Sequence, residues 1–173
     1  MTKKEIALII MVAVIALAAG QLTRYSFKPV SNNPNIVLPH FDFPDTQGEL
    51  RHNHEWQGKI IVFNFWATWC ASCREEIPLL VQLQSQYQDK NVQFVGISID
   101  EDKAVINDYL KTLNINYPIL IAGDGGMRLA RRLGDSSQAI PFTIIVNSQG
   151  EIIYNHEGEL TKVLFEQIIM PLL

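Results

Sequence analysis

Residues 59–74, with the sequence KIIVFNFWATWCASCR, decide the fold of this chain. The first part, Lys59–Phe65, is a nearly continuous apolar run, which is typical of a strand whose two faces are both covered. A helix is expected to follow from Cys70 to Gln86. The C-x-x-C pair of Cys70 and Cys73 therefore stands where a buried strand passes into a helix, an arrangement that indicates an α/β domain with two thiols at its functional end.

These two thiols are the only cysteines of the chain, too few for a disulfide scaffold or for a zinc site without histidines. A helix N-terminus carries partial positive charge and free backbone N–H groups, which favour a thiolate on Cys70. Cys73, one turn further, lies within reach and can attack a mixed disulfide formed at Cys70. We therefore expect a Cys70–Cys73 redox disulfide, with Cys70 as nucleophile and Cys73 as resolving thiol.

A metal site is the alternative interpretation of the thiols, as half of a ligand set, and two structural cysteines are another. There is no second C-x-x-C, and the only histidines are residues 40, 52, 54 and 156. The pair His52 and His54 could be drawn as copper or zinc ligands, but without further ligands nearby a solvated loop is the better interpretation. We expect no metal and no cofactor.

The rest of the chain alternates strands and helices and then ends on a hairpin, which indicates a sandwich with a mixed sheet. Asp100 or Asp102 is expected to cap the helix that runs to about residue 113. The turn at residues 147–150 predicts that the strands on either side are antiparallel neighbours. The other expected elements are a hairpin of 41–43 and 49–51, strands at 92–98, 119–121, 142–146 and 152–154, and helices at 127–133 and 160–169.

The motif WATWCASC at residues 66–73, Pro78 inside the following helix, and Ile140-Pro141 before a strand together resemble the thioredoxin superfamily. The early hairpin and the additional strand and helix between residues 92 and 113 resemble its membrane-tethered extracytoplasmic branch, the TlpA/ResA-like thiol–disulfide oxidoreductases. The resemblance implies a thioredoxin-like three-layer α/β sandwich. It also implies a cis Pro141 against the active-site disulfide, with the backbone of Ile140 free to pair with an extended substrate. Trp69 would shield Cys70 and contact the partner.

One position departs from this pattern, because Asn64 stands where thioredoxins often have a buried aspartate that passes a proton to the resolving cysteine. Glu76 is the candidate replacement, since it lies three residues after Cys73 on the same helix face and matches a glutamate of ResA-like proteins. A half-buried carboxylate there would have a raised pKa and could relay a proton. The alternative is a solvated helix glutamate like Glu75.

The N-terminus carries Lys3 and Lys4 followed by an apolar run from Ile6 to about Leu22. Seventeen helical residues span about 25 Å against a hydrocarbon core of about 30 Å, which is borderline between a transmembrane anchor and a signal-peptide core. We favour an uncleaved single-pass anchor in the cytoplasmic membrane. The domain would then face the periplasm or the cell exterior. The expected division is an anchor or signal segment at 1–24, a linker at 25–37 and the thioredoxin-like domain at 38–173.

The leading functional hypothesis is a reductase of disulfides in exported proteins, with apocytochrome c as the family's best-known client. A membrane thiol–disulfide protein would supply its electrons, because an extracytoplasmic space is oxidising. A disulfide oxidase or isomerase of the same fold, or a thiol-based metal chaperone, are the alternatives. With a net charge of −4, the chain carries no electrostatic signature of a nucleic-acid-binding protein.

Overall fold

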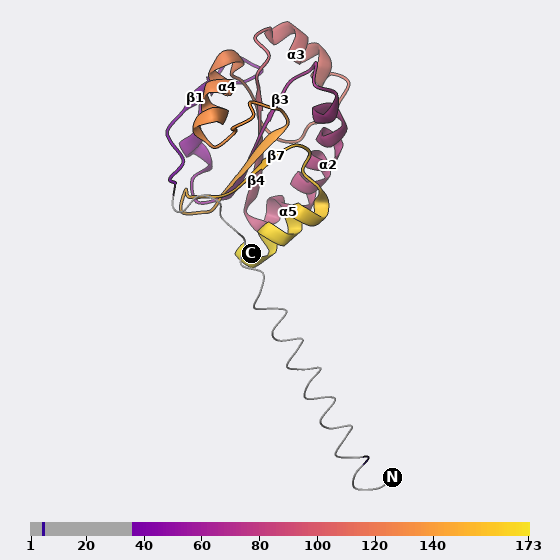
Figure 1. Ribbon diagram of the computed structural model, residues 1–173. Helices are drawn as coiled ribbons and strands as arrows, with labels where there is room; N and C mark the ends of the chain where they lie inside the picture. Colours follow the sequence, from indigo (N-terminus) through magenta and orange to yellow (C-terminus); the bar gives the residue numbers. More distant parts are fainter. Residues whose placement is uncertain (1–4, 6–35) are drawn as a thin grey trace. The chain divides into compact units, whose positions relative to one another are not determined.

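The fold is built on a five-stranded mixed sheet in the order β5-β4-β3-β6-β7. The computed structural model describes Glu5 and residues 36–173 (Figure 1). The central strand β3 pairs parallel with β4 on one side and antiparallel with β6 on the other. The strands are β3 (Ile60–Trp66), β4 (Val92–Ser98), β5 (Ile119–Ile121), β6 (Phe142–Val146) and β7 (Ile152–Glu157), and a separate hairpin pairs β1 (Asp42–Pro44) with β2 (Leu50–His52).

Helices cover both faces of this sheet and give the three layers that the sequence predicts (Figure 1). One core lies between the sheet and α2 (Ala71–Tyr87), α3 (Lys103–Leu110) and α5 (Lys162–Ile169). The other lies under α4 (Gly123–Arg132), together with Phe41 and Trp56 from the hairpin region. Short 3-10 turns complete the chain at η1 (Asn53–Trp56), η2 (Gln88–Lys90) and η3 (Met170–Leu172). The molecule is therefore a thioredoxin-like α/β sandwich.

The start of α4 differs from the sequence prediction, which placed this helix at 127–133. Three glycines lie in its first turn, and glycine disfavours a helix interior by about 1 kcal/mol relative to alanine. Packing outweighs this cost at Gly126, where a Cβ would stand 3.0 Å from the Cβ of Ala122 and 3.1 Å from Cγ2 of Ile99. Glycine lets the helix approach the end of β4 this closely without a shift of these neighbours.

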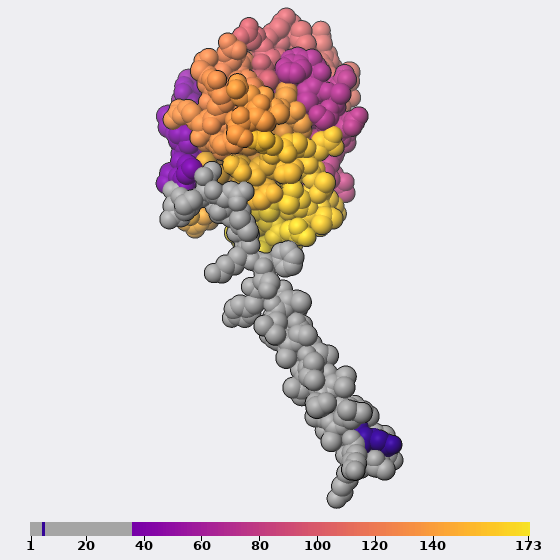
Figure 2. Space-filling model, in the orientation of Figure 1, coloured from indigo at the N-terminus to yellow at the C-terminus, as the bar shows by residue number. Residues whose placement is uncertain are grey.

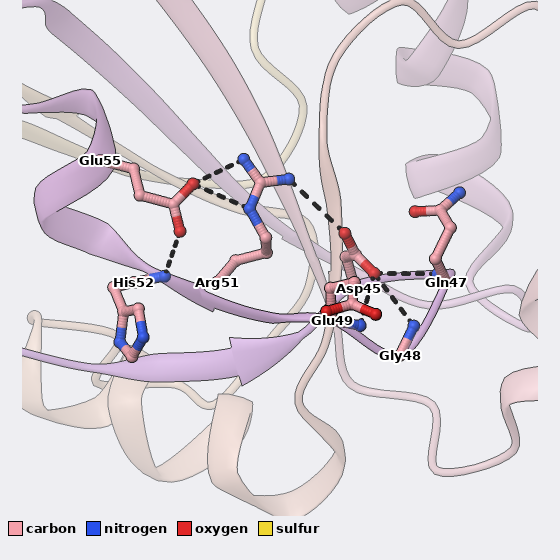
Figure 3. A network of polar contacts seen from close by, with 7 residues as sticks. All are labelled: Asp45, Gln47, Gly48, Glu49, Arg51, His52 and Glu55. Carbon is pink, nitrogen blue, oxygen red and sulfur yellow. Dashed lines mark hydrogen bonds and ion pairs between the residues drawn. The ribbon is translucent and has the colours of Figure 1, made fainter.

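The β1–β2 hairpin is fixed by one buried carboxylate (Figure 3). Asp45 accepts hydrogen bonds of 2.9–3.0 Å from the backbone N–H groups of Gln47, Gly48 and Glu49. Arg51 links Asp45, at 3.5 Å, to Glu55, at 2.6 Å. Asp45 also forms an antiparallel bridge with Leu120 of the outer strand β5, so the hairpin lies against that edge of the sheet.

Residues 36–38 pair with the start of β7, the outer strand on the opposite side of the sheet from β5. The backbone N–H of Leu38 donates to the carbonyl of Gly150 at 2.9 Å, and that of Ile152 donates to the carbonyl of Ile36 at 2.9 Å. The predicted anchor at 1–24 lies outside the described residues, Glu5 excepted. None of the helices in the described part is long and apolar enough to cross a membrane.

Candidate active site

The two cysteines lie where β3 passes into α2 and are joined in a disulfide. Cys70 is the N-cap of α2, and its Sγ accepts a hydrogen bond from the backbone N–H of Cys73 at 3.1 Å. Cys73 is fully buried, whereas Cys70 keeps 7% of its surface exposed. The sulfur of Cys70 is therefore the one that solvent or a partner can reach first.

The loop before β6 completes the surroundings of this sulfur. The Ile140–Pro141 peptide bond is cis, as the resemblance implies, and the Sγ of Cys70 lies 3.7 Å from the carbonyl oxygen of Ile140. Figure 2 shows the two segments meeting at the surface, where the magenta residues that begin α2 border orange residues of this loop. Trp69 stands next to Cys70 with 67% of its surface exposed. The structure thus gathers Cys70, Cys73, Ile140 and Pro141, with Trp69 at the rim.

Glu76 lies deeper than the half-buried position that the sequence suggested, with only 3% of its surface exposed. Its Oε1 accepts the backbone N–H of Leu160 at 2.7 Å, and its Oε2 accepts an N–H of Asn64 at 3.0 Å. Burial outweighs these two hydrogen bonds and raises the pKa of Glu76 from 4.5 to about 7. A carboxyl with this pKa exchanges protons near neutral pH.

Asn64 connects Glu76 to β6, the strand that follows Pro141. Its side-chain nitrogen donates to Glu76 and also to Oγ1 of Thr143 on β6, each at 3.0 Å. An aspartate at this position would have no hydrogens to donate when ionised, and it would set a second carboxylate against Glu76. The exchange of aspartate for asparagine therefore suits a buried glutamate on the neighbouring helix.

The loop between β3 and Cys70 has a partner that the sequence did not reveal. Asp102 caps α3 by accepting the N–H of Ala104 at 2.8 Å, one of the two alternatives predicted. Asp100 instead accepts both the backbone N–H and the hydroxyl of Thr68, each at 2.8 Å. The one signal in the sequence for this contact was the position of Asp100. It follows the buried strand β4, whose parallel neighbour β3 ends just before the loop that leads to Cys70.

His40 lies beside His52 and His54, the two histidines that the sequence analysis considered as metal ligands. The rings of His52 and His54 lie 5.1 Å apart between centroids, and the ring of His40 lies 6.2 Å and 5.9 Å from them, respectively. No group of three histidine, cysteine or acidic side chains among the described residues is placed to hold a metal ion. These rings lie with the hairpin region and take no part in the arrangement around Cys70.

Comparison with known proteins places this site in a family. The family model described as Redoxin matches residues 32–167. The chain is 28% identical over 129 residues to the thiol-disulfide oxidoreductase ResA of Halalkalibacterium halodurans, covering 75% of this chain and 71% of that protein. It is 30% identical over 171 residues to the thioredoxin-like protein YneN of Bacillus subtilis, covering 96% and 97%.

A solved structure supports the same assignment. A thiol:disulfide interchange protein of the thioredoxin family from Chlorobium tepidum superposes with a TM-score of 0.72 at 28% identity, over 82% of this chain and 98% of that one.

Proposed function

Since this chain belongs to the redoxin family and is a thiol–disulfide oxidoreductase of the ResA type, we propose that it reduces disulfide bonds of exported proteins outside the cytoplasmic membrane. The observation that carries the proposal is the Cys70–Cys73 disulfide at the start of α2, with the more exposed sulfur beside the carbonyl of Ile140. A helix N-terminus favours the thiolate that such an exchange needs.

The reaction proceeds through two exchanges. The Cys70 thiolate of the reduced protein attacks one sulfur of a substrate disulfide, so that a mixed disulfide forms and the first substrate thiolate leaves. Cys73 then loses its proton and attacks the Sγ of Cys70. The Cys70–Cys73 disulfide forms and the second substrate thiolate leaves, so two electrons have passed to the substrate. A dithiol donor returns the protein to its reduced state by the reverse exchanges.

Ile140 and Trp69 are the proposed substrate contacts. An extended substrate segment beside Cys70 can pair with the backbone of Ile140, which precedes the cis proline, in the manner of an added strand. Trp69, largely exposed at the rim, offers an aromatic surface to the same segment. Such contacts recognise an unfolded or flexible chain rather than one particular side chain.

Glu76 is the proposed proton carrier for Cys73. Both residues lie on α2 three positions apart and both are buried, so the thiol has little contact with solvent of its own. Because the pKa of Glu76 is raised to about 7, its carboxyl can take the proton that Cys73 releases and pass it on.

The proposed location follows from the apolar run that begins at Ile6, as a membrane anchor with the domain outside. In an oxidising compartment a reductase must be kept reduced by a membrane thiol–disulfide protein. Apocytochrome c is the proposed client, because its two thiols must be free before haem is attached.

The reduction potential of the Cys70–Cys73 pair tests the direction of electron flow. A reductase should have a potential near that of thioredoxin, about −270 mV, and a value near the about −120 mV of a strong oxidase would refute the proposal. Titration of the reduced protein with Cu(I) and Zn²⁺ tests the chaperone alternative, since tight stoichiometric binding with no exchange activity would favour it.

A further inference from the structure

Asp100 is a buried carboxylate that the proposed chemistry does not yet use. It lies two residues beyond β4, and only 8% of its surface is exposed. Burying a carboxylate is costly unless donors surround it. Its Oδ2 accepts the N–H of Thr68 at 2.8 Å and the hydroxyl of Ser98 at 2.9 Å, and its Oδ1 accepts the hydroxyl of Thr68 at 2.8 Å.

The strand pairing explains why Asp100 meets Thr68. Trp66, the last residue of β3, stands opposite Ser98, the last residue of β4, and the two strands run parallel. The N–H of Ile99 donates to the carbonyl of Trp66 at 2.9 Å, which extends this pairing by one step. The two segments therefore leave the sheet side by side at the carboxyl ends of β3 and β4. The first leads to Cys70 and the second leads to α3.

The loop that leads to Cys70 is anchored at its first residue, because Ala67 is fully buried in the core. It spans residues 67–69, and the bond from the N–H of Cys70 to the carbonyl of Ala67, at 3.2 Å, closes it as a tight turn. Trp69 points largely into solvent and cannot fix the loop by packing. Thr68 is the middle residue, and both of its donors are used on Asp100.

We propose that Asp100 is a positioning residue for the thiol exchange, because its carboxylate holds Thr68 and thereby keeps Cys70 at the N-terminus of α2 beside Ile140. Exchange requires the attacking sulfur to approach in line with the disulfide that it breaks, so a small displacement of Cys70 slows it. This inference rests on the proposed role of Cys70 as the attacking thiol.

The test measures single-turnover exchange between the full-length reduced protein and a synthetic disulfide-containing peptide at saturating concentration. Asp100→Ala and Thr68→Val should each lower the maximal rate about tenfold, which corresponds to about 1.4 kcal/mol in the barrier. The double variant should be no slower than Asp100→Ala alone, since Asp100→Ala already removes the hydroxyl contact that Thr68→Val removes. Thr68→Ser, which keeps the hydroxyl, should react at nearly the wild-type rate.

Asp102→Ala is the matched control, because Asp102 is an acidic residue of the same segment that caps α3 without touching the loop. It should lower the melting temperature but leave the exchange rate unchanged. Equal rates for Asp100→Ala and Asp102→Ala would overturn the inference. So would a double variant slowed about a hundredfold, the product of two independent effects, or a Thr68→Ser variant as slow as Thr68→Val.

The test remains decisive if Asp100→Ala does not fold or if the proposed direction of electron flow is wrong. If Asp100→Ala does not fold, the comparison of Thr68→Val with Thr68→Ser decides the question, since only the hydroxyl differs in hydrogen bonding. The rates are also measured from the oxidised protein to a dithiol peptide, so the proposed direction of electron flow can fail while the inference stands. A wild-type protein that exchanges in neither direction would refute the proposed function and this inference together.

Discussion

Replacing Glu76 with glutamine tests the energetic consequence of burying this carboxyl. Burial raises the pKa of Glu76 from 4.5 to about 7, so the folded state holds the proton more tightly than the unfolded state does. Below about pH 4.5 the carboxyl is protonated in both states and costs nothing. Stability falls as pH rises from there through 7, and the full cost is about 3.4 kcal/mol, at about 1.36 kcal/mol per pKa unit.

Between pH 5 and pH 8 the wild-type protein should therefore lose about 2.5 kcal/mol of unfolding free energy through this one group. Glu76→Gln should not show that loss. Glutamine has one oxygen for the two donors, the N–H groups of Leu160 and Asn64, and an unsatisfied donor costs about 1–3 kcal/mol. This offset is independent of pH, so it cancels when each variant is compared with itself at the two pH values.

The assay is urea unfolding at pH 5 and pH 8. The oxidised protein is used because its two cysteines are joined in a disulfide and do not titrate. Glu75→Gln is the matched control, because Glu75 is an exposed neighbour on the same helix. The histidines are common to all three proteins and contribute equally. An identical pH dependence in wild type, Glu75→Gln and Glu76→Gln would show that the buried carboxyl has no such pKa, and the proposed proton carrier would lose its basis.

Cys73→Ser should accumulate a mixed disulfide through Cys70, which gel electrophoresis without reductant detects. Trapping through Cys73 in a Cys70→Ser variant would reverse the assigned roles. Glu76→Gln should lower the pKa of the nearby thiol, seen as alkylation at lower pH, yet slow substrate reduction because the proton carrier is gone. Asn64→Asp should set a second carboxylate beside Glu76 and raise its pKa further, so that the pH-dependent loss of stability moves to higher pH; an unchanged midpoint would contradict this. Because of the apolar run that begins at Ile6, the full-length protein should sediment with membranes, whereas a shortened soluble protein would indicate a cleaved signal.

The sheet could be predicted from the sequence because its central strands are buried on both faces. Such runs are apolar throughout and bounded by turn residues, so β3, β4 and β6 lie within one residue of their expected positions. The helix α4 was placed too late because a pattern of side chains cannot show that the helix packs closely against its neighbours at Gly126. Local composition argues against a helix there, and the tertiary contact overrides it.

The candidate site was predictable where it is local and not where distant segments converge. Cys70 and Cys73 are adjacent in sequence and set by one motif. The depth of Glu76, in contrast, depends on Leu160, which is 84 residues away and donates to it. The role of Asp100 depends on the parallel register of two strands, which no residue pattern in its own segment encodes.

The β1–β2 hairpin has a consequence for solubility. β5 is one of the two outer strands of the sheet, and a bare outer strand is a template on which another chain can add a strand and begin aggregation. The bridge from Asp45 to Leu120 occupies part of that edge, and the bonds from Asp45 to its own turn keep the hairpin in place. The proposed substrate segment pairs instead beside Cys70, at the backbone of Ile140. By covering part of the β5 edge, the hairpin makes the addition of another strand there less favourable.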